Sequence, residues 1–350
     1  MDGTYAGSYG RIRSYYTDFL DDAFMASLVG RKNDEIGQML LKTNYREDLE
    51  ALSSTYSGRA HLENAINRHF VKKNKLAISS PPPGVKDFLK LYVSKWDIDN
   101  IKILLASKEL GHKISLDDTF IVNSRGIPMG VFAGNISPEE FRVLLGLPSL
   151  ESSIDYLSRH PVGVAMASRL DEYRRTADLS FLFTAMDTFY FSEVLRTLLF
   201  IRGDESPVRS YFRDYIDLRN IMVILKARDQ EMDFAIIKER LSPGGSISPA
   251  ALEDLFRNSP VADIYQSAGK VAGGESEQHP ANLSDLEIMT RMHLYRRYHP
   301  SFMASSISVN TIFDFVLTAE RERDILRGIV IGSSYGMKND SVLRLTGMGV

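Results

Sequence analysis

One ten-residue pattern occurs twice in this 350-residue chain, at 96–105 and again at 216–225. Four positions are identical in the two copies: Asp97 and Asp217, Asn100 and Asn220, Ile101 and Ile221, and Leu105 and Leu225. A weaker third copy lies at 321–329, where Asp324 takes the place of the asparagine. Because sequences that repeat over such distances fold as repeated structural units, this pattern constrains the fold more than any other feature.

A second motif follows the first two copies and predicts where the next helices begin. The segment 134–141 resembles 245–252, and in both a glycine precedes Ser-Pro by three positions. Ser137 and Ser248 are predicted N-caps, because a serine oxygen accepts a hydrogen bond from a free backbone N–H group and proline is tolerated directly after it. Glu140 completes a capping box with Ser137.

Apolar residues recur at three- and four-residue spacing along most of the chain, which predicts α-helices. Runs that alternate cleanly between apolar and polar residues are few, so strand signals are weak. Segments rich in proline, glycine and serine interrupt the helical pattern. These breaks fall at 79–84, 126–134, 242–245 and 271–277.

The order and spacing of these elements predict three similar units, which begin near residues 19, 136 and 247. Each unit is expected to start with a capped helix, to continue through an amphipathic middle helix and to end with the helix that carries the Asp/Asn pattern. The middle helices are predicted around 62–70, 183–191 and 286–294. We therefore expect an all-α fold with three pseudo-repeated helical domains, at 1–133 (with an N-terminal lead-in), 134–244 and 245–350.

Composition argues against several classes of partner. The formal net charge is −3, which gives little attraction for polyphosphate, so no nucleic acid partner is expected. The absence of cysteine excludes disulfides and thiolate metal sites. No stretch approaches the roughly 18 consecutive apolar residues that span a membrane, so any membrane association is expected to come through a partner or a surface.

No motif gathers polar residues into a reaction centre. The segment 332–338 imitates a phosphate-binding loop, but its spacing and final residue are wrong, and we interpret it as a polar connection after a helix. His293 and His299 are six residues apart, which places them on different faces of a helix beside three arginines. That helix is interpreted as a basic face, which could meet solvent, a carboxylate partner or lipid headgroups. We expect no catalytic residue, no cofactor, no metal and no small-molecule substrate.

Several segments resemble one known family, the C subunits of archaeal A-type and bacterial V-type ATP synthases and ATPases, whose eukaryotic relative is the d subunit of the V-ATPase. The stretch 95–105 is similar to the family's first Asp-x-x-Asn-Ile helix, and 213–222 is similar to its second. Tyr5 with 10–13 resembles the family's N-terminal motif, and 320–328 resembles its third helix, with Asp324 where the family has asparagine. The resemblance covers essentially the whole chain.

The resemblance implies three related helical domains around a central opening, like a funnel. It implies a non-catalytic central-stalk subunit of a rotary ATPase, peripheral on the cytoplasmic face of the cell membrane. Its implied partners are the D and F subunits of the central shaft and the membrane proteolipid ring, whose rotation couples ATP synthesis or hydrolysis to proton or sodium ion transport. Two alternatives stay open: a helical enzyme whose site is assembled from scattered residues, and a general helical adaptor.

Asp97 with Asn100, and Asp217 with Asn220, each share one face of a helix, because their spacing is three residues. A catalytic pair would need a substrate pocket, and no motif supplies one. We favour a polar pair that ties each helix to a neighbour, and the alternative is that these faces line the opening and contact the shaft. Trp96, the only tryptophan, is interpreted as an anchor in the core or between domains.

Overall fold

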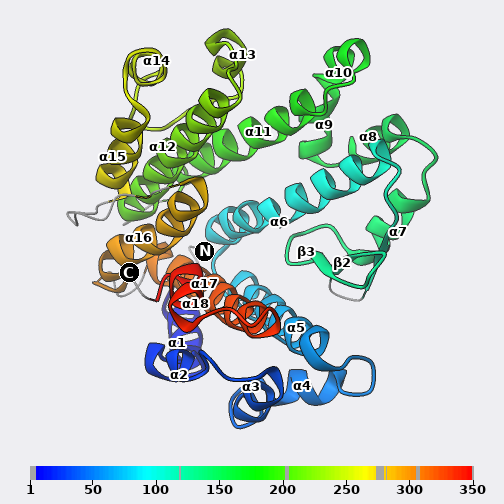
Figure 1. The fold of residues 1–350 in the computed structure, drawn as a ribbon, viewed down its shortest axis with the longest axis vertical. Coiled ribbons are helices and arrows are strands. Elements are labelled where there is room, and N and C mark those ends of the chain that lie inside the picture. Colours follow the sequence, from blue (N-terminus) through cyan, green and yellow to red (C-terminus); the bar gives the residue numbers. More distant parts are fainter. Residues whose placement is uncertain are drawn as a thin grey trace. The chain divides into compact units, whose positions relative to one another are not determined.

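The computed structural model describes residues 5–117, 120–201, 205–272, 280, 282–304 and 308–348. Helices make up 73% of these described residues, which confirms a mostly α-helical fold, and one small three-stranded sheet among them departs from the all-α prediction (Figure 1). The chain divides into two compact units, residues 1–186 with 315–350, and residues 187–314. The predicted domain boundaries at 133/134 and 244/245 stay a prediction.

The first unit contains eleven complete helices among the described residues, and it shares two more with the second unit. The complete ones are α1 (Tyr5–Tyr16), α2 (Asp22–Ser27), α3 (Asn33–Leu40), α4 (Arg46–Leu52), α5 (Gly58–Ser79), α6 (Pro83–Glu109), α7 (Pro138–Gly146), α8 (Leu150–Leu157), α9 (Pro161–Ala167), α10 (Leu170–Thr176) and α18 (Asn339–Thr346). The shared ones are α11 (Ser180–Leu198) and α17 (Val309–Ser334).

The second unit contains the remaining helices of the described residues. They are α12 (Ser206–Asp229), α13 (Phe234–Lys238), α14 (Pro249–Asn258), α15 (Val261–Ala272) and α16 (Leu283–Ala304).

The predicted helix order recurs along the chain. The three middle helices expected from the sequence lie within α5, α11 and α16, and the three copies of the Asp/Asn pattern lie within α6, α12 and α17. The break at 79–84 separates α5 from α6, and the break at 242–245 lies between α13 and α14. Residues 273–277 of the fourth predicted break lie outside the described residues.

The sheet was not expected from the sequence. Its strands β1 (Ile114–Leu116), β2 (Phe120–Asn123) and β3 (Pro128–Val131) form an antiparallel sheet in the order β1-β2-β3. The Asn123 side-chain oxygen accepts hydrogen bonds from two backbone N–H groups of the β2–β3 turn, at 2.9 and 3.1 Å. Such local bonding by asparagine favours a turn, so the predicted break at 126–134 contains a hairpin turn and β3.

The core of the first unit joins helices from both ends of the chain. This core includes Leu28, which follows α2, Ile36 of α3 and Ile66 of α5, and all three are fully buried. They pack with residues of α17 and α18. A Cβ atom on Gly332 would lie 2.5 Å from Val342 Cγ2, so this glycine lets α18 pack closely on α17. Gly332 lies inside α17, which ends at Ser334. The polar connection predicted at 332–338 is therefore shorter than expected and spans 335–338.

The second unit is built around α12, which packs against α14, α15 and α16. Tyr211 of α12 lies at the centre of an aromatic cluster, with ring centroids 5.7 Å from Tyr298 and 5.4 Å from Phe313. Phe302 packs against Phe313 at 5.7 Å in the same cluster. Edge-to-face aromatic pairs of this kind add to the stabilisation that comes from burying their area.

Candidate functional site

Asp97 fastens α6 to the segment that leads into α7. The residue is 3% exposed. Oδ2 accepts the backbone N–H of Asn135 at 2.8 Å, and Oδ1 accepts the backbone N–H of Ile136 at 3.0 Å. Because a buried N–H group without an acceptor costs about 1–3 kcal/mol, the carboxylate stabilises this approach of loop to helix.

Gly134 makes this approach possible. A Cβ atom at this position would lie 2.1 Å from Asp97 Oδ1, closer than any real contact. The Asp97 carboxylate therefore requires the glycine of the repeated motif, three positions before the N-cap of the next helix. The two residues belong to one local structure, although 37 positions separate Gly134 from Asp97 in the sequence.

Asn100 holds the sheet against the same helix. Its side-chain Nδ2 donates to the carbonyl oxygen of Val131 at the end of β3, at 2.9 Å. A Cβ on Gly130 would lie 2.1 Å from Asn100 Oδ1, so β3 passes directly over α6. The sequence motif at 126–134 and the residues directly after it therefore supply the contacts of the Asp/Asn pair.

The predicted N-caps are confirmed. Ser137 Oγ accepts the backbone N–H of Glu140, and Glu140 Oε2 accepts the backbone N–H of Ser137, both at 3.2 Å. Ser248 Oγ accepts the backbone N–H of Ala251 at 3.2 Å at the start of α14. Each cap follows directly after the residues that the preceding Asp side chain holds.

Asp217 makes the same contacts in the second unit. Its carboxylate accepts the backbone N–H groups of Ser246 at 2.8 Å and Ile247 at 3.1 Å. A Cβ on Gly245 would lie 2.0 Å from Asp217 Oδ1. Asn220 and Ser242 exchange two hydrogen bonds: Asn220 Nδ2 donates to the Ser242 carbonyl at 2.9 Å, and the Ser242 N–H donates to Asn220 Oδ1 at 2.8 Å. The interpretation of these pairs as ties to a neighbouring segment is confirmed.

A carboxylate of α17 makes a third contact of this type, with the start of the chain. Glu322 accepts the backbone N–H of Leu20 at 2.6 Å and the hydroxyl of Tyr45 at 2.7 Å. Asp21, the residue after Leu20, is the N-cap of α2 and accepts the backbone N–H of Phe24 at 2.6 Å. Leu20 therefore stands directly before a cap, as Ile136 and Ile247 do.

The register predicted from the sequence missed Glu322. Placing Asp324 in the asparagine position puts Arg321 in the position of Asp97, and Arg321 instead pairs with Asp22 at 2.8 Å. Asp324 pairs with its neighbour Arg323 at 2.9 Å. The carboxylate that makes the contact in the third copy is one position further along and is a glutamate, whose longer side chain reaches the loop from a different place on the helix.

We call these contacts the three latches: Asp97 with 135–136, Asp217 with 246–247, and Glu322 with Leu20. In each latch a buried carboxylate on a long helix accepts a backbone N–H group directly before the N-cap of a short helix. The first latch joins the predicted first repeat to the start of the second, the second joins the second to the third, and the third joins the third to the first.

Burial dominates the electrostatics of Asp97 and Asp217. It raises the pKa of Asp97 to about 7, although the N–H donors of Asn135 and Ile136 act in the opposite direction. Burial also raises the pKa of Asp217 against the donors of Ile247 and Ser246. The pKa of the Tyr45 hydroxyl lies well above its usual value, because it is buried and donates to Glu322. These carboxylates are used by backbone donors of the protein itself, which argues against a role as general bases.

Trp96 lies beside the first latch and anchors three helices. Its ring packs edge-on against Phe70 of α5, with centroids 5.4 Å apart. The guanidinium group of Arg323, from α17, lies 4.8 Å from the Trp96 ring centroid and donates to Asn67 Oδ1 at 2.9 Å. The predicted anchoring role is confirmed within the first unit.

The basic face of α16 meets carboxylates of its own unit. His299 Nδ1 lies 2.7 Å from Asp314 Oδ1, and Arg297 lies 3.3 Å from Asp214. Burial and the nearby Arg296 lower the pKa of His293, as expected for an imidazole beside a cation. Within the ranges that the structure describes, no group of three or more acidic or histidine side chains is placed to hold a metal ion.

The close approach of Gly134 gives a first test. Gly134→Ala is expected to lower the free energy of unfolding by about 2 kcal/mol, because the added methyl group must displace the Asp97 carboxylate. Gly146→Ala is the matched control, since a Cβ there meets no atom within 4 Å and the change should be neutral or slightly stabilising. Urea unfolding followed by circular dichroism measures both, and equal stability of the two variants would contradict the proposed packing.

Comparisons with known proteins identify one family. The sequence profile of the family described as ATP synthase (C/AC39) subunit matches residues 8–345. A protein from Thermoplasma volcanium, named as the C subunit of an A-type ATP synthase, is 34% identical over the full length of both chains. A protein of the same name from Thermoplasma acidophilum is 32% identical to this chain over 97% of each sequence. A third, from Methanocaldococcus jannaschii, is 21% identical over 97% of this chain and 86% of its own.

Proposed function

Because the chain belongs to the ATP synthase (C/AC39) subunit family, we propose that it is the non-catalytic coupling subunit of the central stalk of a rotary A/V-type ATPase. In this role it receives the D and F subunits of the central shaft and passes their rotation to the membrane proteolipid ring. ATP synthesis or hydrolysis is thereby coupled to proton or sodium ion transport. The protein works at the cytoplasmic face of the membrane, where protein partners hold it.

The observation that best supports this role is the cyclic order of the three latches. A part that transmits torque must resist shear between its segments, and close-packed helices deform little. Each latch fixes the end of one predicted repeat to the start of another by a hydrogen bond to a buried acidic residue. We therefore also propose that the three repeats surround a central opening, as the family resemblance implies.

Two further observations agree with a peripheral, non-catalytic role. Among the helices of the described residues, none is long and apolar enough to cross a membrane. The buried acidic groups that could suggest catalysis, Asp97 and Asp217, bind backbone N–H groups of the protein. Their geometry serves the fold and does not present an acid or a base to a substrate.

Co-purification tests this proposal. An affinity-tagged chain expressed in its own host should recover the D and F subunits and the proteolipid from detergent-solubilised membranes, as identified by mass spectrometry. The matched control is the same tag on an unrelated soluble protein of the host. Dissociating the complex should release the chain without loss of its helical circular dichroism signal.

Three outcomes separate the alternatives. Recovery of none of these partners, with the chain only in the soluble fraction, would exclude the coupling role. Recovery of other complexes alone would favour a general helical adaptor. A compact body with one deep cleft in small-angle scattering would favour a helical enzyme, whereas the coupling role requires a hollow body.

A further inference from the structure

The first unit contains a cavity that the latches do not use. It is a half-open pocket of about 230 Å³ between α3 and the helices α4 and α5. A cavity of about 150 Å³ accommodates a molecule the size of benzene, so this one holds roughly six to ten non-hydrogen atoms. It is lined by Asn33, Asp34, Gly37, Gln38, Leu41, Leu49, Gly58, His61 and Leu62.

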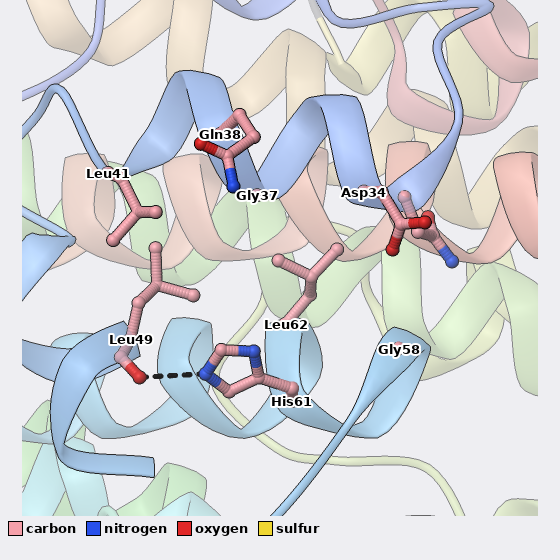
Figure 2. Close-up of a pocket in the computed structure, with 9 residues that line it drawn as sticks. Asp34, Gly37, Gln38, Leu41, Leu49, Gly58, His61 and Leu62 are labelled. Atoms are coloured by element: carbon pink, nitrogen blue, oxygen red, sulfur yellow. Dashed lines mark hydrogen bonds between the residues drawn. The ribbon is translucent and has the colours of Figure 1, made fainter. Parts of the chain in front are cut away.

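The cavity has an apolar side and a polar side. The side chains of Leu41, Leu49 and Leu62 point into the space between the helices (Figure 2). Asp34 and Gln38 of α3 are exposed and lie at the rim. This combination suits a short aliphatic chain that ends in a polar group.

The polar groups of the cavity are mainly hydrogen-bond acceptors. His61 Nε2 lies 2.7 Å from the carbonyl oxygen of Leu49. Since a carbonyl oxygen only accepts, this nitrogen (dashed line in Figure 2) carries the proton, and the Nδ1 atom of the neutral ring is an acceptor. Asn33 donates its amide to Ser334 Oγ at 2.8 Å, and its Oδ1 is buried and does not face the pocket. Asp34 adds a carboxylate, and no lysine or arginine is among the lining residues.

Gly37 widens the pocket on the α3 side. It lies inside α3, where glycine is less favourable than alanine. The nearest atom to a Cβ there would be Leu62 Cδ2 at 3.5 Å, an ordinary contact distance. Packing therefore does not require glycine at this position, and the main effect of the missing side chain is a wider cavity.

We propose that this pocket binds a primary alkylammonium group, with the aliphatic chain on the three leucines and the ammonium on the Asp34 carboxylate at the rim. An ammonium group has three donors and no acceptor, which matches a site made of acceptors. Hydrogen bonds in which both partners are charged are about twice as strong as neutral ones. This binding activity is independent of the coupling role.

Isothermal titration calorimetry of the full chain tests the proposal with two probes. A free amine and the lysine side chain of a polypeptide present the same group, so the probes are 1,4-diaminobutane and Nα-acetyl-lysine methylamide. Saturable binding of the diamine alone identifies a free amine as the ligand, and binding of the lysine derivative alone identifies a partner's side chain. The uncharged control, 1,4-butanediol, should bind at least about tenfold more weakly, since it lacks the charge-assisted hydrogen bonds.

Three variants locate the site. Asp34→Asn should weaken amine binding about tenfold, because it removes the charge that faces the ammonium. Glu35→Gln is the matched control: it is the next residue on α3, it pairs with Arg31 at 3.6 Å and it does not line the cavity. Gly37→Leu should abolish binding and raise the melting temperature, since the leucine side chain fills the space and favours the helix.

Gly37→Leu is expected to lose amine binding and to gain thermal stability. Loss of binding in a more stable protein cannot come from unfolding, so this variant distinguishes a filled pocket from a misfolded chain. Leucine methyl NMR signals of Leu41, Leu49 and Leu62 should shift on titration with the bound probe. The proposal is overturned if neither amine binds, if butanediol binds as tightly, or if Glu35→Gln weakens binding as much as Asp34→Asn.

Discussion

Asp97→Ala is expected to lower the free energy of unfolding by about 3 kcal/mol. The change removes the acceptor of the buried Ile136 N–H and that of the Asn135 N–H, and it leaves a small void beside Gly134. Leaving a buried donor unpaired costs about 1–3 kcal/mol, and the void adds a packing loss. We expect the folded fraction of this variant to keep its affinity for the shaft, because the side chain is occupied within the protein itself.

Chemical denaturation measures the stability of this variant, and co-purification measures its binding. Asp87→Ala is the matched control, because Asp87 lies on the exposed side of the same helix and surface substitutions usually change stability by less than about 0.5 kcal/mol. If Asp97→Ala melts like the wild type but no longer binds the shaft, Asp97 is a contact residue and the latch interpretation is wrong.

The repeats allowed much of this site to be predicted from the sequence. A polar pair that recurs at one spacing, followed by glycine and Ser-Pro, is expected only where the same local structure is built twice. Asp97 and Asp217 make the same two backbone contacts, and Cβ atoms on Gly134 and Gly245 would lie at nearly the same distance from them, 2.1 and 2.0 Å. Repetition turned a weak four-residue motif into a structural prediction.

The sheet could not be predicted in this way, because its strands are only three to four residues long. Over such a length an alternating pattern cannot be distinguished from chance. Pro128 and Gly130 also weaken the strand signal of β3, and Gly130 is there because β3 passes close to Asn100. The requirement of a tertiary contact thus overrode the local propensity.

Glu322 and the cavity were missed for a different reason. A helix presents neighbouring positions in different directions, so a carboxylate can serve an equivalent loop from a shifted register if its side chain is longer. Spacing rules that follow identical residues do not detect such a replacement. The cavity depends on Gly37, Asn33 and His61, which lie up to 28 positions apart and have no shared motif.

The pH dependence of stability should reveal the burial of Asp97. Relative to Asp97→Asn, the wild type is expected to lose stability as pH rises from 4 to 7. Burial raises the pKa of this carboxyl to about 7 in the folded protein, against an ordinary value of 3.8. Between these values the folded state binds more protons than the unfolded state, so the free energy of unfolding falls with pH. The full effect is at most about 4 kcal/mol, since one pKa unit corresponds to about 1.4 kcal/mol.

The comparison with Asp97→Asn isolates this group, because other titrating residues contribute equally to both proteins. Urea unfolding at several pH values between 4 and 9 should show the stability deficit of Asp97→Asn narrowing as pH rises through 7 and levelling off above about pH 8. A deficit that widens with pH would mean that the N–H donors of Asn135 and Ile136 outweigh burial and that the latch is strongest as a charged carboxylate.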